Sequence, residues 1–214
     1  MRYRKDLHVV LLDIRKAYDS VIRTIGKAAA LRRLGVPLRA VEFLMEVDRR
    51  NRNTVRTFWA AFTKGSVADF EALRGFAQGS ADALLLWIIF YDMVLTELEH
   101  RGVGSQVRMD IGRACSQEGG VGAFADDTAV LAQNIEQLQA VLSVLHAVLR
   151  TVLLRLAPEK SQHLSLMFDR TTPESAGVLL SEELVSTGVA HRVTINGVQV
   201  PRLEADVGAR YLGY

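Results

Sequence analysis

Cysteine is nearly absent from the sequence, since Cys115 is the only one. A single cysteine cannot form a disulfide within the chain, and no histidine or second cysteine stands at metal-ligand spacing around it, so we expect neither a disulfide framework nor a structural zinc site. Long apolar runs are missing as well. The longest, Ala83–Tyr91, is far shorter than the roughly 20 residues that a membrane span needs, and no signal-peptide core follows the basic start of the chain. We therefore expect a soluble protein without a membrane partner.

A strong excess of charge is also missing. The 26 basic and 24 acidic residues leave a formal net charge of +2, which neither requires nor excludes a nucleic-acid partner. One region is rich in arginine and could contact phosphates or simply form a solvated helix face: Arg32, Arg33, Arg39, Arg49, Arg50, Arg52 and Arg56. The chain contains no glycine-rich phosphate loop, internal repeat or low-complexity segment, and its histidines are scattered. Its length and its 49% hydrophobic content suit one domain with a real core.

Acidic residues stand where apolar runs end. Asp126 and Asp127 lie between two short runs in Val121–Ala132, which predicts a hairpin with both carboxylates at its tip. Taken alone, such a pair is more often a simple turn. A second run, Val9–Leu12, is followed directly by Asp13, so two strands each bring an acid to one end. Mg²⁺ prefers such oxygen ligands, and two ions about 4 Å apart can assist an in-line phosphoryl transfer.

The residues around these acids resemble the ordered motifs of reverse transcriptases, most of all those of the non-LTR (LINE-type) retroelement branch. The match runs from about residue 8 to the last residue. Five motifs stand in the expected order at plausible spacings: Leu12–Val21, Arg74–Gly79, Phe124–Asp127, Leu156–Ser161 and Arg210–Gly213. Five ordered matches are far more specific than any one of them.

The resemblance implies a polymerase palm, an α+β fold in which an antiparallel sheet is packed by helices on one face. Strands interspersed with helices, with the acids at strand ends, indicate the same fold class. We expect residues 1–214 to be a single reverse-transcriptase-like domain fragment, with part of the fingers at about residues 26–75 and the thumb absent. The missing fingers, the thumb and any endonuclease would belong to a longer polyprotein. We expect an intracellular, nuclear location.

By the same resemblance, the chain is an RNA-directed DNA polymerase that adds deoxynucleotides to a primer 3′-hydroxyl. Asp13 and Asp126 would hold two Mg²⁺ ions, for which Mn²⁺ could substitute, and Asp127 would support the metal site from beside them. The implied partners are an RNA template, a DNA primer and deoxynucleoside triphosphates.

Five further residues match positions that contact the nucleotide or the template. Tyr18 matches the aromatic residue that stacks under the sugar and excludes a 2′-hydroxyl, and it can be a core aromatic at the same time. Arg74, Gln78 and Gly79 match residues that lie against the template and the incoming nucleotide; an ordinary loop is the simpler alternative for this stretch. Lys160 matches a lysine near the leaving pyrophosphate, and a plain surface lysine is an almost equally good interpretation.

The spacing of apolar residues and the residues that start or stop helices predict the main helices and strands. A capping-box spacing at Asn134 and Gln137 and the pair Asn196-Gly197 are the sharpest local signals. We expect helices at 17–34 and 38–47, the latter with a buried stripe of Leu38, Val41, Leu44 and Met45; a strand at 54–63; a helix along Leu84, Trp87, Ile88, Tyr91 and Leu95; a turn at 101–120; a long helix from Ile135 to Leu156, stopped by Pro158; a strand at 164–168; and a hairpin at 191–200.

Two other functions are compatible with parts of this pattern. Ser80–Leu84 lacks the prolines that the family has after Gln-Gly, which favours a degenerate, non-catalytic nucleic-acid-binding scaffold. Clustered carboxylates oppose that alternative, because they repel one another when no metal is bound. A nuclease or another two-metal phosphoryl transferase would explain the acids, but it would not explain Tyr18 or Gln78-Gly79.

Overall fold

The computed structural model describes residues 6–50, 53–54, 69–70, 74–76, 83–102, 109–110, 116–117, 120–124, 126–168, 178–179 and 192–203. The chain forms two compact units, the first made of Met1–Arg15 and Met93–Tyr214 and the second of Lys16–Asp92. The division falls inside one helix, α5 (Ala83–His100). In the described part of the chain, no helix is long and apolar enough to cross a membrane.

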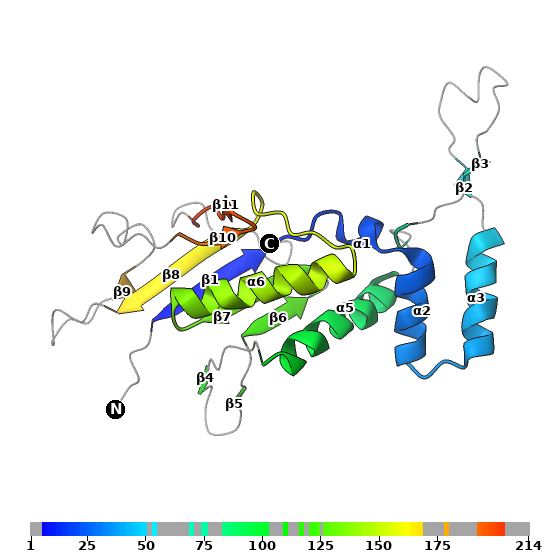
Figure 1. Ribbon diagram of the computed structural model, residues 1–214, viewed down its shortest axis with the longest axis horizontal. Helices are drawn as coiled ribbons and strands as arrows, with labels where there is room; N and C mark the ends of the chain where they lie inside the picture. Colours follow the sequence, from blue (N-terminus) through cyan, green and yellow to red (C-terminus); the bar gives the residue numbers. More distant parts are fainter. Residues whose placement is uncertain are drawn as a thin grey trace, which may run out of the picture. The chain divides into compact units, whose positions relative to one another are not determined.

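The first unit contains a five-stranded antiparallel sheet in the order β6–β7–β1–β8–β9. Its central strand is the N-terminal one, which pairs with two strands that come much later in the chain (Figure 1). The strands are β1 (Leu7–Leu12), β6 (Val121–Phe124), β7 (Asp127–Ala132), β8 (Gln162–Phe168) and β9 (Val178–Leu179). β8 therefore begins two residues before the predicted strand at 164–168.

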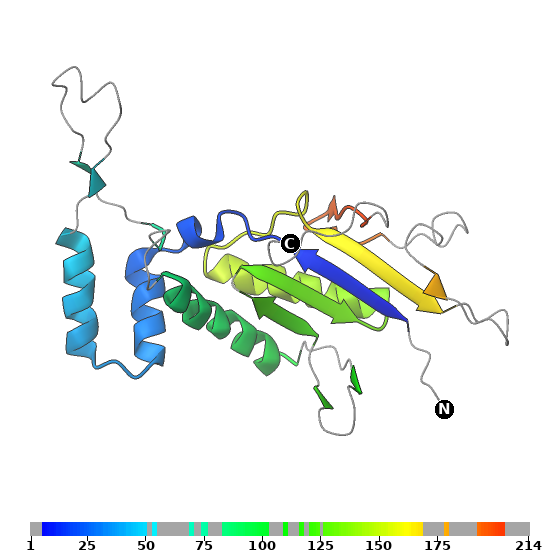
Figure 2. The ribbon, with the colours of Figure 1, turned by 180° about the vertical axis from the view of Figure 1, so that it is seen from behind.

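Side chains of β1 and β7 alternate between buried and half-buried positions, as period-two strands with one covered face require. The covered face carries Val10 of β1 and Val130 of β7, which lie opposite each other and are fully buried. Helix α6 (Ile135–Thr151) lies across this face, and Figure 2 shows the other face of the sheet in front of it. This arrangement confirms the predicted α+β fold with helical packing on one face.

Helix α6 contributes most of the core beneath the sheet. Its buried side chains follow the predicted apolar stripe: Leu138, Val141, Leu142, Leu145, Val148 and Leu149. Asn134 is the N-cap, and its side chain accepts a hydrogen bond of 2.7 Å from the backbone N–H of Gln137. The predicted capping interaction is thus present.

The C-terminal end of α6 differs from the prediction. The helix stops at Thr151, well before Pro158, because Leu153 adopts a left-handed conformation with φ 63°. The N–H groups of Leu153 and Leu154 donate to carbonyl groups of the last helical turn, which is the Schellman pattern. Leu156 therefore lies beyond the helix, where it forms an isolated antiparallel bridge with Ile14.

The second unit begins with two helices where the sequence predicted one over 17–34. α1 (Ala17–Ser20) ends at Val21, whose backbone is extended, and α2 (Arg23–Arg33) follows. The adjacent Ile22 forms an antiparallel bridge with Arg74, which cannot form inside a continuous helix. Helix α2 ends as predicted at Gly35, which has a φ of 75°.

Two other helices have a buried face that differs from the predicted one. α3 (Leu38–Arg50) buries Val41, but Leu38 is 59% exposed because it is the first residue of the helix. In α5, Trp87 and Tyr91 are buried as predicted, whereas Leu84 and Ile88 are each 49% exposed. The first turns of α5 are apolar on nearly every side, so periodicity alone could not select the packed face.

Short strand pairs complete the described structure. β10 (Thr194–Ile195) and β11 (Val198–Gln199) enclose Asn196-Gly197, both with positive φ, which confirms the predicted hairpin. β2 (Asn53–Thr54) pairs with β3 (Asp69–Phe70), and β4 (Met109–Asp110) with β5 (Ser116–Gln117). Most of the predicted strand at 54–63 and most of the predicted turn at 101–120 lie outside the described residues, as does the whole motif Arg210–Gly213.

Candidate active site

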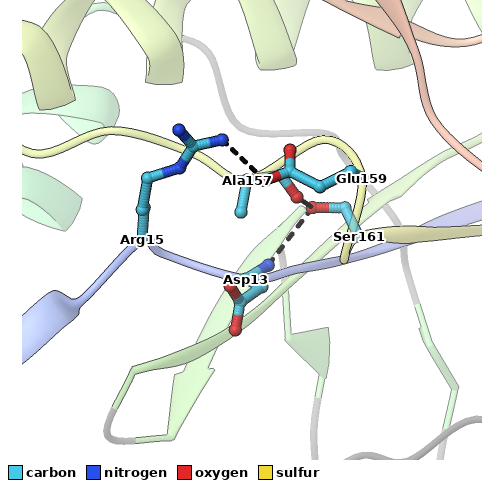
Figure 3. A network of polar contacts seen from close by, with 5 residues as sticks. All are labelled: Asp13, Arg15, Ala157, Glu159 and Ser161. Atoms are coloured by element: carbon cyan, nitrogen blue, oxygen red, sulfur yellow. Dashed lines mark hydrogen bonds and ion pairs between the residues drawn. The ribbon is translucent and has the colours of Figure 1, made fainter.

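Asp13 directly follows β1, and its backbone is fixed on both sides by the segment that precedes β8. The N–H of Asp13 donates to the Ser161 hydroxyl oxygen at 3.2 Å, and its carbonyl accepts from the Ala157 N–H at 2.9 Å. The Ser161 hydroxyl in turn donates to the Ala157 carbonyl at 2.9 Å. Figure 3 shows these groups around Asp13. A hydroxyl is needed at position 161 because it accepts from one backbone group and donates to another.

The same segment is joined to the chain beyond Asp13. The N–H of Arg15 donates to the Arg155 carbonyl at 2.8 Å, and the Arg15 guanidinium pairs with Glu159 at 2.6 Å (Figure 3). Both side chains of this ion pair are about half exposed, so its contribution to stability is small. The backbone hydrogen bonds hold the turn beside Asp13.

The other two acids stand on the neighbouring strand. β6 and β7 form the predicted hairpin, with Asp126 in its turn and Asp127 as the first residue of β7. The register of β1 and β7 sets Leu12 opposite Thr128, and its continuation by one residue sets Asp13 opposite Asp127. Directly opposed side chains share one face of a sheet, with Cβ atoms about 4.5–5.5 Å apart. All three acids are half-buried.

The electrostatics of Asp13 reflect these neighbours. Burial raises the pKa of the Asp13 carboxyl above its ordinary value of 3.8, and the charges of Asp126, Asp127 and Glu159 raise it further. The ammonium of Lys160 acts in the opposite direction and is the second largest influence after burial. Lys160 is exposed in the turn before β8 and lies within electrostatic reach of Asp13.

This donor set has the chemistry that a hard divalent cation requires, because each member is a carboxylate and a cation would relieve their mutual repulsion. Among the described residues, no group of three acidic, histidine or cysteine side chains is arranged to hold one ion. The geometry therefore gives a shared electrostatic environment for the three acids and not a formed coordination shell.

Two of the predicted nucleotide-contacting residues lie in the second unit. The Tyr18 ring packs on Trp87 with ring centroids 5.1 Å apart, and the Tyr18 carbonyl accepts a hydrogen bond from the Phe76 N–H. Arg74 is exposed and bridges to Ile22. Tyr18 is thus half-buried against an aromatic core.

Gly75 allows the Arg74–Phe76 segment to pack closely against the start of the second unit. Its φ of 86° lies in the region that favours glycine, and a Cβ there would come within 3.1 Å of the Asp19 Cα. The Gly75 carbonyl accepts from the Arg23 Nε at 2.6 Å, and its N–H donates to the Val21 carbonyl.

The structure thus sorts the predicted site residues into groups. The first unit contains four of them at one end of its sheet: Asp13, Asp126, Asp127 and Lys160. Tyr18 and Arg74 belong to the second unit, and Gln78 and Gly79 lie outside the described residues. Sequence reasoning gave no role to Ser161 or to the Arg15–Glu159 pair. Ser161 ends a recognised motif and so carried a signal, whereas the ion pair spans 144 positions and had none.

Comparison with known proteins then decides the family. The profile of the family described as reverse transcriptase (RNA-dependent DNA polymerase) matches residues 1–214. The chain belongs to the reverse transcriptase family.

Reverse transcriptase relatives agree with the non-LTR branch. A Retrovirus-related Pol polyprotein from type-1 retrotransposable element R2 of Nasonia vitripennis is 33% identical over 165 residues, which is 76% of this chain and 14% of that protein. The protein of the same description from Bradysia coprophila is 28% identical over 166 residues, which is 78% of this chain and 17% of that protein. The chain therefore spans only about a sixth of these relatives.

Solved structures match this reverse transcriptase chain as well. Among them is apo telomerase from Candida tropicalis, truncated from the C-terminal domain, with 12% identity and a TM-score of 0.46 over 82% of this chain and 33% of that one. A similarity at this level is too distant to add to the argument.

Proposed function

We propose that the chain carries the catalytic acids of an RNA-directed DNA polymerase, which adds deoxynucleotides to the 3′-hydroxyl of a DNA primer along an RNA template. The observations that support this proposal most directly are the positions of Asp13 directly after β1 and of Asp127 at the start of β7, next to the paired Leu12 and Thr128, and the effect of the Asp126 and Asp127 charges on the pKa of Asp13. The family membership of the chain supports the same reaction.

The acids are suited to two Mg²⁺ ions, with Mn²⁺ as a substitute, held by Asp13 and Asp126 with Asp127 beside them. When bound, such ions supply charge neutralisation at the transferred phosphoryl group and polarise the attacking hydroxyl. The protein's own contribution is positioning. Ser161 and Ala157 fix the backbone of Asp13, and Lys160 adds a positive charge where the leaving pyrophosphate would be stabilised.

The deciding experiment is primer extension on an RNA template with Asp126→Asn, which keeps side-chain volume but removes one charge. We expect extension to fall on the order of a thousandfold, because metal assistance supplies several kcal/mol and about 1.4 kcal/mol is a factor of ten. The matched control is Glu136→Gln, an exposed carboxylate in the first turn of α6, which should extend like the wild type.

The same experiment separates the enzyme from a non-catalytic scaffold. Because the R2 relatives are much longer, extension is measured on the chain alone and with flanking fingers and thumb regions supplied. Wild-type protein that binds primer-template but does not extend it in either form would support the scaffold. Equal extension by the wild type and Asp126→Asn would remove this acid from the mechanism.

Tyr18 is proposed to select deoxynucleotides by excluding a 2′-hydroxyl. Tyr18→Val removes the ring and should raise ribonucleotide incorporation relative to deoxynucleotide incorporation by roughly tenfold or more, since a steric clash of 1–3 kcal/mol is relieved. Tyr18→Phe keeps the ring that packs on Trp87 and should keep the selectivity. Unchanged selectivity in an active Tyr18→Val enzyme would contradict the proposed role.

A further inference from the structure

A cavity of about 400 Å³ lies in the first unit, lined by residues of α6, the segment after it and the β10–β11 hairpin. Cationic groups dominate its polar lining: the side chains of Arg15, Arg150 and Arg155 contribute, together with His146 and Glu159. The volume is in the range that holds a small ligand. None of these residues belongs to the acidic cluster of Asp13, Asp126 and Asp127.

The charges in this cavity are not balanced. Arg15 pairs with Glu159 at 2.6 Å, so these two groups largely neutralise each other. Among the described residues, the guanidinium groups of Arg150 and Arg155 have neither a hydrogen bond nor an ion pair. Three arginines against one glutamate leave two uncompensated positive charges in one hollow, which favours an anion there.

His146 adds a hydrogen-bonding group next to these charges. Burial lowers the pKa of the His146 imidazole from its ordinary value of 6.5, and the positive charge of Arg150 lowers it further. The imidazole is therefore neutral at pH 7 and can donate one hydrogen bond and accept another. Arg15, Arg155 and Glu159 line the same cavity and are the other charged groups that face it.

Apolar residues also line the cavity. Leu154, Leu156 and Ile195 are buried, and Val198 of β11, which is 49% exposed, offers apolar surface. The side chain of Asn196, at the tip of the hairpin, also lines the cavity and offers both a donor and an acceptor. Apolar surface beside a few convergent polar groups is the usual composition of a small-molecule site.

We propose that this cavity binds a nucleotide unit, with its phosphate on Arg150 and Arg155 and its base against Val198 and Asn196. Guanidinium groups match phosphate oxygens bidentately, and Val198 gives the base an apolar contact that an acidic peptide would leave unused. The unit can come from a single-stranded nucleic acid or from a free nucleotide. The choice of ligand rests on the proposed function, but binding here requires neither the acids nor metal.

The test compares the 214-residue wild type with Arg150→Gln/Arg155→Gln. A matched control, Arg101→Gln/Arg192→Gln, removes the same charge from two exposed positions of the same unit that do not line the cavity. Binding of labelled oligouridylate, uridine monophosphate and an oligoglutamate peptide is measured in EDTA, so that failure of the metal-dependent reaction cannot affect the result. The imidazole NMR signal of His146, assigned with His146→Gln, reports occupancy of the cavity.

The cavity variant should bind oligouridylate or uridine monophosphate at least about tenfold more weakly, because charge-assisted hydrogen bonds are lost. For oligouridylate, the salt dependence of log K should become shallower by about 0.7, since the two arginines hold one phosphate and each lost phosphate contact of a single strand accounts for about 0.7. The control should bind like the wild type. The nucleotide probe that binds the wild type should shift the His146 signal there and not in the cavity variant.

Loss for oligouridylate alone identifies a strand as the source, and loss for the mononucleotide identifies a free nucleotide. Three results overturn the proposal: equal weakening in the cavity variant and the control, unchanged binding of both nucleotide probes in the cavity variant, or cavity-dependent binding of oligoglutamate alone.

Discussion

At the scale of single residues, Asp13 is where folding and function oppose each other. Its backbone is fixed by Ser161 and Ala157, so the carboxyl cannot escape its neighbours by a shift of the chain. Burial and the adjacent acids disfavour the ionised form, and among the described residues Lys160 favours it. A carboxylate held in this way gains more from a bound cation than a solvated one would. The fixed backbone therefore maintains an unfavourable charge where the proposed function needs it.

This opposition predicts a pH-dependent effect of Asp13→Asn. The folded-state pKa of Asp13 lies above its ordinary value of 3.8. At pH values between these two pKa values, the native state binds more protons than the unfolded state, so the free energy of unfolding falls as pH rises through this range. The variant lacks this cost, so without divalent cations it should be more stable than the wild type at pH 7. The difference should shrink as pH falls toward 3.8.

Urea denaturation at a series of pH values measures this effect. Glu136→Gln, which alters an exposed carboxylate outside the acidic cluster, is the control. A constant difference between Asp13→Asn and the wild type across the series would show that the effect does not arise from the ionisation of Asp13.

At the scale of elements, the sequence predicted those features that local patterns determine. The strand before Asp13, the acidic hairpin, the start of α6 and the Asn196-Gly197 turn were all predictable, because alternation, capping and turn chemistry act within a few residues. The break between α1 and α2 was not predictable. It depends on the bridge between Ile22 and Arg74, which are 52 residues apart in the numbering.

The end of α6 escaped prediction for a different reason. A Schellman end usually has glycine in the left-handed position, and here that position is occupied by Leu153. Burial of Leu154, which is fully inaccessible to solvent, stabilises the turn that follows. Without the usual glycine, the only visible stop signal was Pro158. Burial of Leu154 thus keeps Leu153 in its strained left-handed conformation.

Leu153→Gly should therefore stabilise the protein. The side chain of Leu153 is 52% exposed, so little burial is lost, while a left-handed leucine costs roughly 1–2 kcal/mol. After the extra backbone entropy of glycine is deducted, we expect a gain of about 0.5–1 kcal/mol, or a thermal midpoint higher by roughly 1–4 °C. Leu153→Ala retains a Cβ and is the control. If alanine matched glycine in thermal unfolding, relief of backbone strain could not be the cause.

At the scale of the whole molecule, the acidic cluster depends on topology. β1 pairs with β7 and β8 across most of the chain length, so Asp13 meets Asp127 and Lys160 only after the sheet has formed. The motifs identified which residues belong to the site. They could not show that an ion pair between Arg15 and Glu159 would join the turn to the strand, because such contacts leave no local pattern.

Because the acids meet only in the folded sheet, Mg²⁺ should stabilise the whole chain. A ligand that binds the native state alone raises stability by RT ln(1 + [L]/Kd), or about 1.4 kcal/mol at ten times Kd, and the midpoint of a protein of this size should rise by roughly 3–6 °C. Asp126→Asn should show a much smaller rise, since it removes one carboxylate from the cluster. Glu136→Gln should respond to Mg²⁺ like the wild type.

Thermal unfolding with MgCl₂ is compared with NaCl of equal ionic strength, so that general screening of the repelling carboxylates is subtracted. In NaCl, Asp126→Asn should be at least as stable as the wild type, because one member of the repelling cluster is gone. If Asp126 instead serves only the hairpin turn, asparagine would replace most of its hydrogen bonding, and the variant would be slightly less stable and as responsive to Mg²⁺ as the wild type. An equal Mg²⁺ response in both proteins would therefore assign Asp126 to the turn and remove it from the proposed metal site.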